Sequence, residues 1–220
     1  MEKSIEFLNA VLRQLALDIA AAHQSAPPVA AVELTETSAT LHLTEPADLP
    51  DPWIASPDKL RWTATTSAHV SAGPHSAPAP FPLLVTIGRD EDGHWWLLNL
   101  EHLGTITIGG DTERARDLLR YIACELGLAP WADSARIDGV GTGSEAARMN
   151  PARTRFHDTD TEAADNVLAD ALEMIDRADG LDTDTPTGRS TQIDDELWLA
   201  RLLLVDAVEA DEASLQRLIN

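Results

Sequence analysis

The stretch from Thr105 to Arg120, TITIGGDTERARDLLR, has the layout of a phosphate-binding loop. The apolar residues at 106 and 108 predict a strand over Thr105–Ile108, followed by a glycine turn and at once by a helix. Glycines at such a turn let the backbone approach a ligand, and the N-terminus of the following helix attracts anions. A nucleotide bound at this place would contact the following residues: Gly109, Gly110, Asp111, Thr112, Arg116 and Asp206.

The same stretch lacks the side chains that a working phosphate-binding loop requires. The pattern GxxxxGK[ST] supplies a lysine for the β- and γ-phosphates and a hydroxyl for Mg²⁺. Here the corresponding residues run from Glu113 to Asp117, and the only two lysines of the chain, Lys3 and Lys59, lie elsewhere. Asp111 is also well placed to cap the helix itself. The residues favour a structural turn, with weak or altered nucleotide binding as the alternative.

A second segment has the pattern of a magnesium-binding strand. Residues 201–206, RLLLVD, form an apolar strand that ends in Asp206, as in the strand whose carboxylate holds Mg²⁺ in P-loop enzymes. No glutamate follows directly, because Ala207 and Val208 come next. Asp206 is therefore interpreted as a strand-end cap, with a place in a ligand cleft as the alternative. Asp138, near the end of an earlier apolar strand, is interpreted in the same way.

Other catalytic and metal-binding patterns are missing from the sequence. The seven histidines are scattered, without HExxH or His-x-x-x-His spacing, so we predict no metal site. The segment from Gly141 to Ser144 lacks the following glycine of a nucleophile elbow. Cys124 lies in an apolar helical stretch, where a thiol acts as a small apolar group. We therefore predict no catalytic residue, no metal ion and no cofactor.

Composition restricts the partners. The formal net charge of −21 repels phosphate backbones and anionic lipids, so we expect no nucleic-acid partner. No run of 18 apolar residues occurs, and acidic residues interrupt the first 22 positions, so neither a membrane span nor a signal peptide is predicted. The single cysteine fits a reducing compartment. We expect the cytoplasm, or the cytoplasmic region of a membrane-anchored protein.

Apolar periodicity predicts the order of the elements. The helices are expected over residues 3–23, Asp111–Leu126, Thr161–Ala178 and Glu212–Ile219. Two strands are expected as a hairpin within 29–43, and further strands over 60–63, 83–87, 95–100, Thr105–Ile108, Ala135–Val140, Thr154–His157 and Leu199–Ala207. Loops are expected over Gly141–Pro151 and Gly180–Gln192.

This order predicts an α/β fold. Residues 1–66 would form a helix and a small antiparallel β subdomain, and the segment 67–80, rich in proline and small residues, would be a linker. Residues 81–220 would form a three-layer α/β domain with a mostly parallel sheet, because strands and helices alternate from Gly104 onward.

The order of features resembles the ATPase modules of FtsK-type DNA translocases and type VII secretion motors. The matching segments are residues 97–100, 106–111, 118–120, 134–140 and 202–206, and the family's Lys-Ser/Thr pair falls on Ala115-Arg116 or Arg116-Asp117. Residues 85–101, 110–133 and 198–205 are also similar to the middle region of large actinobacterial proteins with LysM and bacterial transcriptional-activator-type domains.

The resemblance implies a degenerate P-loop-like module within a larger regulatory or envelope-linked protein. We expect it to be a non-catalytic, pseudo-ATPase-like module. Its partner would be another protein or the flanking domains of a longer chain. The alternative is a nucleotide-binding switch, in which an arginine replaces the lysine of the phosphate-binding loop. The sequence leaves the partner's identity and the oligomeric state open.

Overall fold

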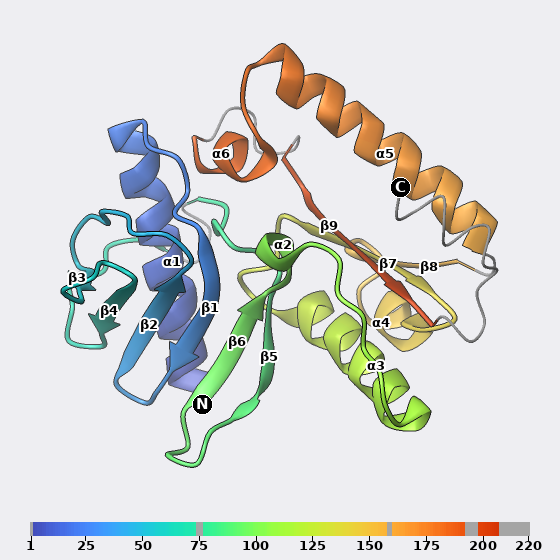
Figure 1. Cartoon of the computed structure of the whole chain (residues 1–220), viewed down its shortest axis with the longest axis horizontal. Helices are drawn as coiled ribbons and strands as arrows, with labels where there is room; N and C mark the ends of the chain where they lie inside the picture. The colour runs from blue at the N-terminus through green and yellow to red at the C-terminus, as the bar shows by residue number, and fades with distance from the viewer. Residues whose placement is uncertain (1, 74–76, 158–159, 192–197, 207–220) are drawn as a thin grey trace.

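The computed structural model describes residues 2–73, 77–157, 160–191 and 198–206, with the side chains of 160–164 left aside. Within these residues the chain is a mixed α/β protein with an N-terminal helix, an antiparallel sheet and a smaller parallel sheet (Figure 1). The predicted helix over Glu212–Ile219 lies outside the described residues.

The larger sheet is antiparallel and has six strands in the order β3-β4-β2-β1-β6-β5. The predicted hairpins within 29–43 and 83–100 are both confirmed, as is the strand near residue 60. Buried and half-buried positions alternate along β2, and along β1 except at Ala31 and Val32, near which the register of the two strands shifts. The six strands are β1 (Val29–Leu34), β2 (Ser38–Leu43), β3 (Ile54–Ala55), β4 (Arg61–Thr65), β5 (Leu84–Arg89) and β6 (Trp95–Asn99).

One sheet contains strands from both sides of the segment that we expected to be a linker. Val32 of β1 pairs with Leu97 of β6, and the pairing continues along both strands. The hairpin of β5 and β6 therefore extends the antiparallel sheet. Within the linker segment itself, Ala77 and Ala79 are buried.

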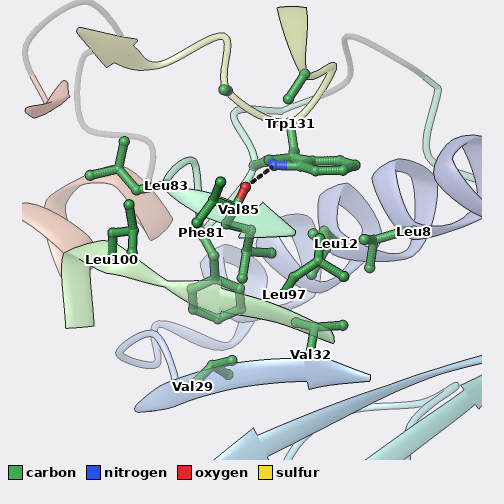
Figure 2. Close-up of a cluster of buried hydrophobic side chains, with 14 of the residues drawn as sticks. Leu8, Leu12, Val29, Val32, Phe81, Leu83, Val85, Leu97, Leu100 and Trp131 are labelled. Atoms are coloured by element: carbon green, nitrogen blue, oxygen red, sulfur yellow. Dashed lines mark hydrogen bonds between the residues drawn. The ribbon is translucent and has the colours of Figure 1, made fainter. Parts of the chain in front are cut away.

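Helix α1 (Glu2–Ala22) packs against this sheet, as its apolar periodicity predicts. Leu8 and Leu12 are fully buried, and Figure 2 shows them in one cluster with Val32 and Leu97. Complete burial of such a side chain contributes about 1.5–3 kcal/mol. Trp131 belongs to the same cluster, and its indole N–H donates a hydrogen bond to the carbonyl oxygen of Leu84 at 3.0 Å.

The smaller sheet is parallel, with β7 between β8 and β9, and its strands are confirmed as predicted. Helix α5 lies on one side of these strands, while α3 and α4 lie on the other (Figure 1). These elements are α3 (Thr112–Leu128), β7 (Ala135–Val140), α4 (Ser144–Met149), β8 (Thr154–His157), α5 (Asp160–Gly180) and β9 (Ala200–Val205).

The predicted strand over Thr105–Ile108 is wrong. The chain leaves β6 directly into a short helix, α2 (Leu100–Leu103), and continues as irregular backbone to the start of α3. Gly104 ends α2 with a φ of 68°, a left-handed conformation that favours glycine. Because the segment joins neither sheet, its side chains lack the cover that a strand would receive, and Ile106 is 48% exposed.

Two predicted loops contain short helices. The loop over Gly141–Pro151 includes α4, and the loop over Gly180–Gln192 includes α6 (Thr185–Ser190). Asp184 caps α6 by accepting a hydrogen bond from the backbone N–H of Thr187 at 2.7 Å. An Asp followed two residues later by Pro186 is a helix-start signal, which the polar composition of this loop concealed.

Glu125 of α3 joins this helix to the edge strand β5. Its carboxylate accepts hydrogen bonds from the backbone N–H and the hydroxyl of Thr86, at 2.9 Å and 2.5 Å. Burial raises the pKa of Glu125 above its ordinary value of 4.5, although the bonds from Thr86 act in the opposite direction. The folded protein therefore holds this proton more tightly than the unfolded chain does.

Glu125→Gln should reduce the pH dependence of stability. With a raised pKa in the folded state, the contribution of Glu125 to stability is full below pH 4.5 and is lost as the pH rises through the folded-state pKa. The amide keeps the size of the side chain and can still accept from Thr86, but it does not titrate. Urea unfolding at several pH values from 4 upward measures the difference; Glu113→Gln, exposed on the same helix, should follow the wild type. An unchanged slope in Glu125→Gln would contradict this assignment.

Candidate functional site

The carboxyl ends of the parallel strands form the candidate site. Val140 of β7 lies between His157 of β8 and Val205 of β9 in the register of the sheet. Ligands of open α/β sheets bind outside this edge, where loops follow the strands. The turn after β7 contains Gly141 and Gly143, both with positive φ, and leads into α4.

Arg116 and Asp206 meet at this edge. The Nε atom of Arg116 lies 2.5 Å from Oδ2 of Asp206, so the second turn of α3 contacts the residue that follows β9. Asp206 is 5% exposed, and its backbone N–H donates to the carbonyl oxygen of Val140 at 3.0 Å. Two residues that the sequence places in the candidate nucleotide site are thus brought together, as an ion pair.

The other four candidate residues lie at the exposed start of α3. Gly109, Gly110, Asp111 and Thr112 are all exposed, and Gly110 has a φ of 111°. The side chain of Asp111 accepts a hydrogen bond from the backbone N–H of Arg114 at 3.0 Å. The N-terminus of α3 is therefore capped by the protein's own carboxylate, as the spacing of Asp111 indicates.

A partly buried network of charged side chains lies beside the edge. Asp138, 1% exposed in β7, accepts a hydrogen bond from Nε2 of His157 at 2.7 Å. The Nε atom of Arg155 lies 2.9 Å from the same carboxylate. Asp170 of α5 pairs with Arg155 at 3.1 Å and with Arg201 at 2.6 Å.

This network balances its own charges. Each of the two carboxylates faces at least one guanidinium, which compensates for burial. Burial acts to lower the pKa of Arg155, but its bonds to Asp138 and Asp170 raise the pKa overall. Sequence reasoning singled out Asp138 alone. The other members come from separate strands and a helix, and only the register Asp138↔Arg155 brings them together.

Within the described ranges, no group of three or more His, Cys, Asp or Glu side chains has an arrangement that could hold a metal ion. None of the helices formed by these residues has the length and apolar character needed to cross a membrane.

Comparison with known proteins gives no match to a protein-family model, to a curated protein or to a solved structure.

Proposed function

We propose that this chain is a non-catalytic, pseudo-ATPase-like module that serves protein interaction or regulation within a larger actinobacterial protein. Its α/β fold would be a degenerate version of the P-loop arrangement. The contact between α3 and the end of β9 supports this relationship, because the helix after a phosphate-binding loop lies beside the magnesium-binding strand in that arrangement. The expected compartment is the cytoplasm or the cytoplasmic region of a membrane-anchored protein.

The ion pair between Arg116 and Asp206 is the observation that carries the proposal. A bound nucleotide would need the arginine for its phosphates and the carboxylate for Mg²⁺. Here the two charges satisfy each other, and Asp206 is buried. A nucleotide would have to separate this pair before the two side chains could bind it, and the cost of separation would lower its affinity.

The charges around the start of α3 support the same conclusion. Asp111 occupies the capping position that a phosphate would take, and Glu113 lies in the first turn of the helix. The whole chain carries a net charge of −21, which adds long-range repulsion against a triphosphate. The backbone N–H of Arg114 at this helix start therefore already donates to a carboxylate of the protein itself.

Thermal unfolding with and without nucleotide tests the proposal. We expect millimolar Mg·ATP or Mg·GTP to leave the midpoint of the wild type unchanged, because a ligand that does not bind the folded state does not stabilise it. Inorganic triphosphate with Mg²⁺ should be equally silent. A midpoint that rises with nucleotide concentration would overturn the proposal.

Two charge-reversal variants identify the site if a shift occurs. Arg116→Glu removes the arginine that would replace the P-loop lysine, whereas Arg120→Glu makes the same charge change one turn further along α3. In a nucleotide-binding switch, the shift would vanish in Arg116→Glu and persist in Arg120→Glu. The proposed module gives no shift in the wild type or in either variant.

A further inference from the structure

Helix α5 presents apolar side chains to solvent on the outside of the parallel sheet. Leu172 is 60% exposed and Ile175 is 54% exposed, and residues three apart on a helix are neighbours on its surface. Ala169, one turn before Leu172, is exposed as well. The three exposed residues form one apolar stripe along α5.

Aspartate side chains lie beside this apolar stripe on α5. Asp165, Asp176 and Asp179 are exposed, and each lies four residues from Ala169, Leu172 or Ile175 respectively. They therefore share the exposed face of the helix with the apolar residues. Arg177 is the one basic residue between 165 and 180, and it pairs with Glu173 at 3.4 Å.

The exposed apolar residues and carboxylates of α5 together determine which kind of partner could bind there. A surface that covers the stripe must bury apolar side chains and bring positive charge close to the carboxylates. Lys and Arg do both, because their long stems cover apolar surface while their charged ends reach outward. A second copy of the chain would oppose acid with acid at a net charge of −21 per copy, and nucleic acid or anionic lipid would be repelled for the same reason.

We infer that the exposed face of α5 binds a basic amphipathic helix of a partner protein. The apolar side of that helix covers Leu172 and Ile175, and its Lys or Arg side chains reach Asp176 and Asp179. The inference rests on the proposed function, since it names the surface and the chemistry of the interaction.

A designed peptide provides the probe. It is a helix of about 15 residues, with leucines repeating at helical spacing and lysines elsewhere. Binding to the full chain is measured by fluorescence anisotropy at low and moderate salt. We expect saturable binding that weakens with salt, and a peptide with glutamate in place of lysine should not bind.

Matched variants separate binding at α5 from attraction to the overall negative charge. Leu172→Ser with Ile175→Ser, and separately Asp176→Lys with Asp179→Lys, should each weaken binding by about tenfold or more. Glu36→Lys with Glu91→Lys makes the same charge change in exposed turns of the six-stranded sheet and should change affinity by less than about twofold. Circular dichroism verifies that each variant is folded.

Several results would overturn the inference. One is that the wild type does not bind the lysine peptide. Another is that the Asp176→Lys, Asp179→Lys variant and the Glu36→Lys, Glu91→Lys variant weaken binding equally. The third is that the variant with two serines binds as well as the wild type. Each of these outcomes leaves the response to nucleotide untouched, so the proposed function and this surface fail in separate experiments.

Discussion

Arg13→Met is expected to lower the free energy of unfolding by about 3–5 kcal/mol, because it removes a buried guanidinium that pairs with one carboxylate and donates to two backbone carbonyl oxygens. The Arg13 side chain is 1% exposed in α1. Its Nη2 atom donates to the carbonyl oxygen of Pro130 and to Asp133, both at 2.7 Å, and Nη1 donates to the carbonyl oxygen of Ala77. Methionine nearly fills the space but leaves these acceptors without a donor.

Urea unfolding followed by tryptophan fluorescence measures the effect of Arg13→Met. Lys3→Met is the control, because it removes a cation from an exposed position of the same helix and should change stability by at most about 0.5 kcal/mol. Equal stabilities of the two variants would show that Arg13 does not hold α1 to the chain segments around residues 77 and 130.

Arg189→Met is expected to have an effect of similar size, about 3–5 kcal/mol. Arg189 is buried in α6 and forms two parallel hydrogen bonds with the carboxylate of Glu101, at 2.7 Å and 2.9 Å. It also donates to the carbonyl oxygens of Trp198 and Pro80. The paired bonds to one carboxylate require the planar guanidinium, so Arg189→Lys should recover only part of the lost stability.

A double-mutant cycle with Glu101→Gln tests this second prediction. If the two side chains stabilise each other, the double variant should be more stable than the sum of the single effects predicts, by about 1–3 kcal/mol. Independent, additive losses would place the effect of Arg189 in its contacts with Trp198 and Pro80. Stability of Arg189→Met within about 0.5 kcal/mol of the wild type would contradict the prediction outright.

The sequence predicted most elements correctly because their apolar residues recur with a clear period. Helix α1 follows the spacing of Leu8, Leu12 and Leu15, and β2 follows an alternation of buried and less buried residues. Pairing between distant strands left no such local signal. The register of β1 with β6 depends on packing across the whole core, so we did not predict a six-stranded sheet.

The expected strand over Thr105–Ile108 shows that a local pattern of apolar residues does not by itself determine strand conformation. Ile106 and Ile108 alternate as they would in a strand, but strand conformation also requires a neighbouring ladder, which this segment lacks. The helix that follows was predicted correctly, because Asp111 carries its own capping signal.

The sequence named candidate residues of the site but did not predict the contact between two of them. Arg116 and Asp206 were both named from sequence, each as a ligand-binding residue. Their mutual contact depends on the place of α3 beside β9, which no spacing in the sequence specifies. The buried pair of Asp138 and His157 was missed for the same reason, because the two residues meet only through the register of β7 and β8.

The proposed module requires that Arg116 and Asp206 neutralise each other and leave no place for a nucleotide at the start of α3. The most direct measurement is a titration of the ¹⁵N-labelled protein with Mg·ATP, followed through the amide resonances of Gly109, Gly110 and Thr112. We predict that these resonances do not move at millimolar nucleotide. Saturable shifts of these amides, accompanied by a change at the Arg116 Nε–H, would contradict the account.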